Sequence, residues 1–200
     1  MLKFIGNLKN GKPQKIVAYG TSLTAKGAWC TLLSNELEKR FPGLTDVVNS
    51  GESAMNSQWA VENLSEKVLA QKPDVLFIEF AVNDAFGEYG ISISAARINL
   101  KYIIERVATD CPDCELILMT MNPPTEIHLE KRPAYEMYYK LYRDIAEERS
   151  LTLIDNCKIW KELFEKDKKL FKELIPDGLH PAPEGDKCIT LKNIIDVCLN

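Results

Sequence analysis

The sequence lacks a long apolar run and lacks an excess of basic residues. No stretch approaches the roughly 18–20 consecutive apolar residues of a membrane-spanning helix. Residues 1–7 contain no apolar segment long enough for a signal peptide. The 25 basic and 29 acidic side chains give a formal net charge of −4, without the clustered basic face that nucleic-acid binding requires. We therefore expect a cytoplasmic protein with no membrane span and no nucleic-acid partner.

Cysteine is present, but in no arrangement typical of a disulfide framework or a metal site. The six cysteines are scattered through apolar or helical patterns, and only Cys111 and Cys114 have C-x-x-C spacing. That pair precedes a predicted strand, whereas a redox pair normally opens a helix after a strand. No second pair completes a zinc site. We expect reduced thiols, no metal and no cofactor.

Histidine is scarce, which narrows the search for a general base to His128 and His180. The ordinary pKa of histidine lies close to neutral pH, so this side chain is the most frequent proton acceptor in catalysis. His180 lies three residues after Asp177, and this spacing lets the carboxylate hold one ring nitrogen. His128 has no aspartate at such a spacing. We expect His128 to be exposed to solvent or to contact substrate from its loop.

Short apolar runs alternate with amphipathic stretches along the whole chain. Their continuous apolarity, without polar residues between, indicates strands buried on both faces, as in a parallel sheet. The stretches between them carry apolar residues at helical spacing. The pattern predicts one α/β domain over residues 1–200, a three-layer α/β/α sandwich, with residues 1–14 as an N-terminal extension. The predicted strands are 16–19, 46–49, 75–80, 116–121 and 151–154.

Polar side chains follow the predicted strands at the points where ligands bind in open parallel sheets. Ser22 follows the first strand, residues 49–51 the second, residues 83–84 the third, and residues 177–180 precede the C-terminal helix. Right-handed crossovers bring the carboxyl ends of all strands to one edge of the sheet. The irregular segment 122–132 is long enough to shape a pocket at this edge.

These residue types fit acyl transfer by an activated serine. A serine hydroxyl needs a base to take its proton, and the base needs an acceptor to orient it. Asp177 would hold one nitrogen of His180, so that the other nitrogen faces Ser22. Three donors would stabilise the developing oxyanion: the backbone amides of Ser22 and Gly51, and the side-chain amide of Asn83.

The four segments, in this order, resemble the sequence blocks of the SGNH (GDSL-type) hydrolase family of esterases and lipases. Residues 20–24 resemble its nucleophile block, 48–51 its glycine block, 82–84 its asparagine block and 177–181 its D-x-x-H-P block. The resemblance runs from about residue 16 to the C-terminus. It implies a flavodoxin-like five-stranded parallel sheet of order 2-1-3-4-5, serine-dependent ester hydrolysis and no metal.

Two positions depart from the family pattern. Thr21 stands where an aspartate normally precedes the serine and braces the loop. Ala81 stands where a glycine normally lies two residues before the asparagine. We expect altered loop geometry at Thr21 and an altered backbone near Asn83, with every catalytic group retained.

The function predicted on these grounds is a serine esterase or acylhydrolase that cleaves a small ester through an acyl-enzyme intermediate. Short acyl groups, including those of O-acetylated carbohydrates, fit a 200-residue domain with short loops. Two alternatives stay open: an acyltransferase that uses the same Ser-His-Asp site, and a non-catalytic carbohydrate-binding module on the same fold. A homodimer also stays open. Trp29, Trp59 and Phe86 either line the pocket or belong to the core, and their helical stripes favour the core.

Overall fold

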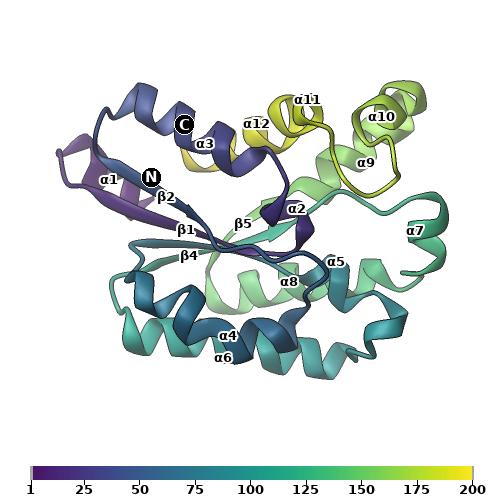
Figure 1. Cartoon of the computed structure of the whole chain (residues 1–200), viewed down its shortest axis with the longest axis horizontal. Helices are drawn as coiled ribbons and strands as arrows, with labels where there is room; N and C mark the ends of the chain where they lie inside the picture. The colour runs from purple at the N-terminus through teal and green to yellow at the C-terminus, as the bar shows by residue number, and fades with distance from the viewer. Residues whose placement is uncertain (1, 200) are drawn as a thin grey trace.

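The computed structural model, which describes residues 2–199, has a parallel sheet between two layers of helices (Figure 1). All strand pairs are parallel, and the order is β2-β1-β3-β4-β5. The three-layer architecture and the strand order are therefore confirmed. The observed strands differ by one or two residues at their ends from the predicted ones. They are β1 (Gln14–Gly20), β2 (Thr45–Asn49), β3 (Val75–Glu79), β4 (Glu115–Thr120) and β5 (Thr152–Asp155).

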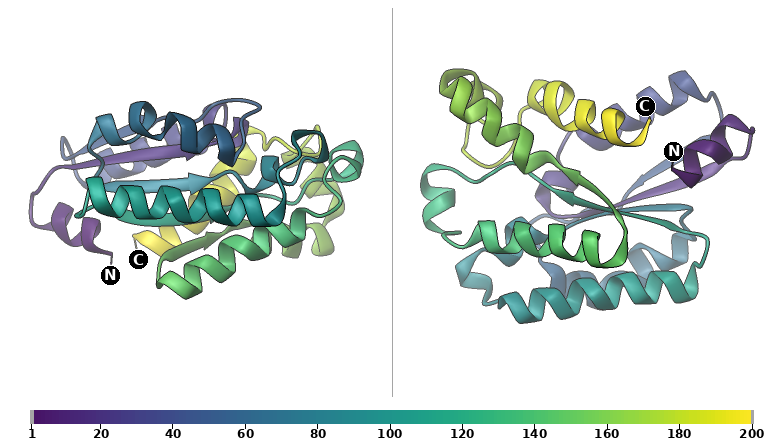
Figure 2. Two further views of the ribbon diagram at one scale, coloured as in Figure 1. Left: turned by 90° about the horizontal axis from the view of Figure 1, so that it is seen from below. Right: turned by 180° about the vertical axis from the view of Figure 1, so that it is seen from behind.

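The helices divide between the two faces of the sheet (Figures 1 and 2). One face carries α3 (Trp29–Arg40), α9 (Asn156–Lys166), α10 (Lys168–Leu174), α11 (Pro183–Gly185), the π-helix η3 (Asp186–Leu191) and α12 (Lys192–Cys198). The other face carries α4 (Ser57–Lys67), η1 (Leu69–Gln71), α6 (Ile93–Asp110) and α8 (Tyr135–Arg149). Among the described residues, no helix combines the length and apolarity that crossing a bilayer would require.

The core lies on both sides of the central strands. Every residue of β3 is buried, and Val17 and Ala18 of β1 are fully buried between the helix layers. Full burial of an aliphatic side chain stabilises the folded state by about 1.5–3 kcal/mol. The edge strand β2 is only partly buried. The apolar runs of β1, β3 and β4 thus correspond to strands that helices cover on two faces, whereas β5, the other edge strand, is only partly buried like β2.

Residues 3–9, within the predicted N-terminal extension, form the short helix α1 (Lys3–Lys9). Its Phe4, Ile5 and Leu8 are buried in the core. The helix has no side-chain cap of its own, but the backbone N–H groups of Lys3 and Phe4 each donate to the Glu115 carboxylate at 3.0 Å. An acidic group at a helix N-terminus is stabilising. Both ends of the described chain lie near α1, at the amino edge of the sheet (Figure 2).

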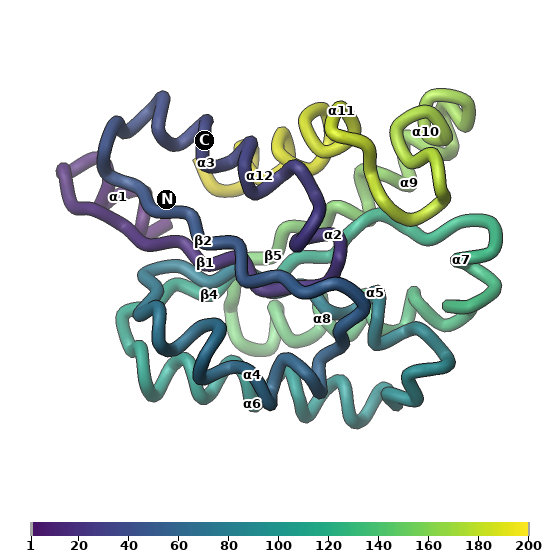
Figure 3. Tube along the Cα trace, viewed as in Figure 1, coloured from purple at the N-terminus to yellow at the C-terminus, as the bar shows by residue number. Residues whose placement is uncertain are grey.

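The carboxyl edge of the sheet lies at the opposite end and carries short helices (Figure 3). These are α2 (Ser22–Ala25), α5 (Ala81–Asp84), η2 (Gly87–Tyr89) and α7 (Glu126–Glu130). The segment 122–132, predicted as irregular, therefore contains one helix of its own, and this part of the prediction is wrong. Thr125 precedes α7 and its backbone binds Gly178, so the segment is ordered by a neighbouring loop that is distant in sequence.

Candidate active site

Ser22 is the first residue of the short helix α2 and directly follows β1 through Thr21. Thr21 is the N-cap, and its Oγ1 accepts a hydrogen bond from the backbone N–H of Leu23 at 3.2 Å. Such a cap contributes about 1 kcal/mol. The N–H of Ser22 has no acceptor within residues 2–199, as expected for the first turn of a helix. This donor is therefore free to bind a ligand.

A buried carboxyl group braces this turn from the neighbouring strand. Glu79, the last residue of β3, accepts hydrogen bonds from the Thr21 N–H at 2.7 Å and from the Thr24 hydroxyl at 2.6 Å. It also accepts from the Thr21 hydroxyl at 3.0 Å. The glycine before the cap is required here, because a Cβ on Gly20 would lie 2.2 Å from a Glu79 carboxylate oxygen. The bracing acidic group that is missing at position 21 thus comes from β3.

The brace has an unusual electrostatic environment. Burial raises the pKa of Glu79 from an ordinary value of 4.5 to about 7, although hydrogen bonds from Thr24 and Thr21 oppose the shift. Asp84, at the end of α5, is also buried, and burial raises its pKa to about 7. Its carboxylate accepts the N–H of Ser57 at 2.7 Å, so it binds a backbone amide. Both carboxyl groups titrate near neutral pH.

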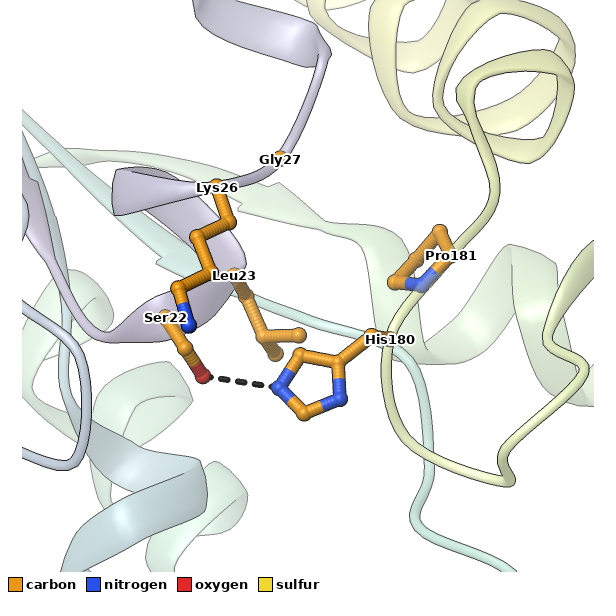
Figure 4. A pocket seen from close by; sticks show the side chains of 6 residues that line it. All are labelled: Ser22, Leu23, Lys26, Gly27, His180 and Pro181. Carbon is orange, nitrogen blue, oxygen red and sulfur yellow. Dashed lines mark hydrogen bonds between the residues drawn. The ribbon is translucent and has the colours of Figure 1, made fainter.

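The loop that carries His180 brings its ring to Ser22, 158 residues away in sequence (Figure 4). The Ser22 Oγ and the His180 Nε2 are 2.9 Å apart. The other ring nitrogen, Nδ1, lies 2.7 Å from Asp177 Oδ2. Since the carboxylate can only accept, Nδ1 carries the proton and Nε2 is free to accept the serine proton. Ser22, His180 and Asp177 are thus joined by a continuous chain of hydrogen bonds.

Asp177 is fixed by its own loop as well as by His180. Its Oδ1 accepts the backbone N–H groups of His180 at 2.7 Å and of Leu179 at 2.9 Å. Partial burial pushes the pKa of Asp177 upward, but these N–H groups and the imidazole hold it below its usual value. The carboxyl group is therefore ionised at neutral pH, which is the state that orients an imidazole.

The segment 122–132 supports the histidine loop from outside. Gly178 has a φ of +84°, and a Cβ there would lie 2.9 Å from the Thr125 hydroxyl oxygen. The Thr125 N–H donates to the Gly178 carbonyl at 2.9 Å, and the Asn122 side chain donates to the Leu179 carbonyl at 2.8 Å. His128, on α7, is half-buried, and its ring centroid lies 6.3 Å from that of His180.

The predicted oxyanion donors differ in how free they are. One hydrogen of the Asn83 side-chain amide goes to the Met55 carbonyl at 2.9 Å, which leaves the second hydrogen. The Gly51 N–H is already bound to Asn49 Oδ1 at 3.0 Å. The missing side chain of Gly51 serves packing instead, because a Cβ would lie 2.6 Å from the backbone nitrogen of Ala25. The Ser22 N–H and one Asn83 amide hydrogen are therefore left without an acceptor among residues 2–199, whereas the Gly51 N–H is already bound.

A small cavity of about 200 Å³ opens beside the Ser22–His180 pair (Figure 4). Its remaining lining comes from Leu23, Lys26, Gly27 and Pro181. Trp29 is fully buried, and its indole N–H donates to the Leu23 carbonyl at 3.1 Å, so this tryptophan belongs to the core. Trp59 and Phe86 do not line the cavity. Across the described chain, no group of three or more His, Cys, Asp or Glu side chains could hold a metal.

A parallel α/β/α sandwich with a serine, a histidine and an aspartate joined at its carboxyl edge has the general form of a hydrolase. The model of the GDSL-like Lipase/Acylhydrolase family matches residues 16–188. The chain belongs to this family, and its enzyme class is that of the carboxylic ester hydrolases.

Individual proteins that resemble this chain do so at low sequence identity. A Bacillus subtilis protein described as uncharacterized lipoprotein YqeF is 28% identical over 88% of this chain and 86% of its own length. The isoamyl acetate-hydrolyzing esterase 1 homolog of Rattus norvegicus is 25% identical over 86% of this chain and 77% of that protein.

Solved structures share the fold. Axe2, an acetylxylan esterase from Geobacillus stearothermophilus, has a TM-score of 0.79 and 21% identity, over 92% of this chain and 94% of that one. LAE5, an α/β hydrolase from the metagenome of Lake Arreo, has a TM-score of 0.78 and 22% identity, over 94% of this chain and 97% of that one.

Proposed function

We propose that the protein is a serine esterase that hydrolyses a small, short-acyl ester. The observation that carries the proposal is the continuous hydrogen-bonded arrangement of Ser22, His180 and Asp177, with distances of 2.9 and 2.7 Å. In the proposed reaction the Ser22 oxygen attacks the ester carbonyl while His180 Nε2 takes its proton. Asp177 stabilises the imidazolium that forms.

The developing negative charge falls on the former carbonyl oxygen. We assign its stabilisation to the Ser22 N–H and to the free hydrogen of the Asn83 amide. Gly51 stays a prediction, since its N–H would have to exchange the Asn49 side chain for the substrate oxygen. His180 then protonates the leaving alcohol, and a water molecule hydrolyses the acyl-enzyme with His180 again as the base.

The size of the cavity supports a short acyl group. About 200 Å³ lies below the roughly 300–1,000 Å³ of pockets that enclose drug-sized ligands. Two relatives agree with this choice: the name of the rat protein describes isoamyl acetate hydrolysis, and Axe2 is described as an acetylxylan esterase. Acetyl esters of alcohols or sugars are therefore the substrates we propose first.

The test is hydrolysis of p-nitrophenyl acetate by the parent enzyme and by Ser22→Ala. We expect kcat/KM to fall by about three orders of magnitude or more, because residual rates come only from substrate binding and the oxyanion donors. Ser94→Ala, on the exposed side of α6, is the matched control and should retain full activity. A Ser22→Ala enzyme as active as the parent would defeat the assignment.

A series of acyl lengths tests the substrate class separately. Acetyl and butyryl esters should be cleaved with higher kcat/KM than palmitoyl esters, because the cavity cannot enclose a long chain. If palmitoyl esters are the best substrates, the acyl chain binds elsewhere and the short-acyl assignment is wrong. That result would leave the role of Ser22 untouched.

A further inference from the structure

Arg132 is a buried cation that packs against the helix carrying Asn83. The residue comes shortly after the end of α7 in the sequence and is only 6% exposed. The guanidinium Nε donates to the Val82 carbonyl at 2.9 Å, and Nη2 donates to the Asn83 side-chain oxygen at 3.2 Å. The group also lies over the ring of Phe86, 4.8 Å from its centroid. It therefore contacts α5 on both backbone and side chain.

The charge of Arg132 has no acidic partner among residues 2–199. No carboxylate of the described chain forms an ion pair with it. Arginine remains protonated when buried, and buried charges in proteins are usually paired. By contrast Arg143, which is also partly buried, binds Asp155 through two contacts of 2.7 and 2.9 Å. The unpaired guanidinium lies beside a proposed oxyanion donor.

The contacts of Asn83 fix which way its amide points. Arg132 can only donate, so the atom that faces it must be the amide oxygen. The Met55 carbonyl can only accept, so the atom that faces it must be the amide nitrogen. The two partners agree on one orientation, and a rotated amide would lose both hydrogen bonds. One hydrogen of the amide remains for a substrate.

We propose that Arg132 is a positioning residue that holds the Asn83 amide with its N–H groups toward the ester carbonyl. A rotated amide would present an oxygen to the oxyanion and repel it, so the contact serves the transition state more than the ground state. The unpaired positive charge works in the same direction, since it polarises the amide whose hydrogen meets the oxyanion. The inference rests on the proposed function of Asn83 as an oxyanion donor.

The first measurement is the steady-state kinetics of Arg132→Met with p-nitrophenyl acetate. Loss of an oxyanion donor commonly lowers kcat by about 10²–10³-fold, and a mispositioned donor should lose part of this, about 10- to 100-fold. KM should change less than about twofold, because the ground-state carbonyl binds the donor weakly. Arg143→Met removes a partly buried guanidinium that binds Asp155 and should leave kcat within about twofold of the parent.

The second measurement is a double-mutant cycle with Asn83→Ala. If Arg132 acts through the amide of Asn83, adding Arg132→Met to Asn83→Ala should lower kcat by less than about twofold. Two effects that multiply independently would overturn the proposal, as would an Arg132→Met enzyme with unchanged kcat. Melting curves identify variants that fail to fold, and Arg132→Lys then serves in their place: its compact ammonium lacks the two separate nitrogens with which the guanidinium holds Val82 and Asn83, so kcat should again fall.

A spectroscopic control checks that the Arg132 charge lies next to α7 in solution. Arg132 Nη1 lies 3.4 Å from His128 Nδ1, and burial together with the Arg132 charge lowers the pKa of His128. In Arg132→Met the titration of His128, followed by NMR, should move to higher pH. With only two histidines in the chain, the two imidazole signals are readily assigned.

The two proposals fail in distinguishable ways. If Ser22→Ala keeps its activity, the proposed function fails. If Ser22→Ala loses activity and Arg132→Met does not, only the inference about Arg132 fails.

Discussion

Each of the two loops that meet at the site is held by an acidic side chain, and one of these side chains is buried while the other is exposed to solvent. The nucleophile turn depends on Glu79, which is 2% exposed and whose pKa burial raises to about 7. The histidine loop depends on Asp177, whose side chain is 49% exposed and whose pKa lies below its usual value. Both carboxyl groups accept backbone N–H groups. The difference is solvent access, and it determines which group stays charged.

The comparison separates a structural carboxyl group from a chemical one. Asp177 is ionised, reaches the imidazole directly and can be neutralised without opening the core. Glu79 lies under α2, touches no group of the proposed reaction, and holds the turn from which Ser22 projects. Variants of Asp177 should therefore change activity, and variants of the brace formed by Glu79 and Thr21 should change stability.

The largest expected effect is on catalysis by Asp177→Asn. An asparagine would leave the geometry but favour the wrong imidazole tautomer, so kcat should fall on the order of 10³–10⁴-fold. The melting temperature should stay near that of the parent, because the side chain is exposed. Steady-state kinetics and calorimetry test the two halves. Asp167→Asn, another exposed loop aspartate, is the control, and a large drop in its kcat would contradict the comparison.

The next effect is on stability and tests the departure at position 21. Thr21→Asp restores the residue of the family pattern but puts a second carboxyl group beside Glu79, within reach of its oxygens. An uncompensated buried charge destabilises by about 3–5 kcal/mol. Urea denaturation should show this loss, and Thr21→Asp combined with Glu79→Gln should recover most of it. A stable single variant would mean that the two carboxyl groups share a proton without penalty.

The third effect is a pH dependence of stability that Glu79→Gln should reduce. The folded pKa of about 7 lies above the ordinary 4.5, so the folded protein holds this proton more tightly than the unfolded chain. The tighter proton binding adds at most about 3 kcal/mol to the free energy of unfolding. This stabilisation is fully present below pH 4.5 and is lost as the pH rises to about 7. Denaturation at several pH values tests it. A parent and a Glu79→Gln variant with equal slopes would contradict it; Asp84 contributes equally to both.

The smallest effect belongs to Thr21→Val. Valine keeps the shape of threonine but loses the N-cap acceptor for Leu23 and the donor to Glu79. Loss of a cap hydroxyl lowers the free energy of unfolding by about 1 kcal/mol. Activity should change little once the enzyme is folded. If Thr21→Val loses as much stability as Thr21→Asp, the loss in Thr21→Asp comes from the missing hydroxyl. Repulsion between two carboxyl groups would then not be needed to explain it.

Much of the fold was predictable because the informative patterns are local. The continuous apolar runs located the five strands to within one or two residues at either end. The helix α7 within 122–132 was not predicted, since its order comes partly from the contact between Thr125 and Gly178. Helix α1 was not assigned either: it has only seven residues, and its amide groups are satisfied by Glu115. Short helices depend on distant partners that a local pattern does not contain.

The candidate site divides in the same way. The three-residue spacing between Asp177 and His180 was enough to predict their contact, because a single loop brings the two side chains together. The sequence analysis singled out neither Glu79, which lies within the predicted strand 75–80, nor Arg132, which ends the segment 122–132. Their roles depend on partners 58 and 49 residues away, and no spacing within the sequence indicates such contacts. The bond between Gly51 and Asn49 is local, but it depends on how the loop turns after β2.

The sequence by itself determined the layers of the molecule and the residue types that gather at the carboxyl edge, because apolar periodicity and the direction of parallel strands are properties of the chain. Only the tertiary structure decided which of those groups are charged and which are free to bind. Burial and hydrogen bonding set the pKa of a carboxyl group and the orientation of an amide, and both are fixed by neighbours that the fold brings in from other strands and loops.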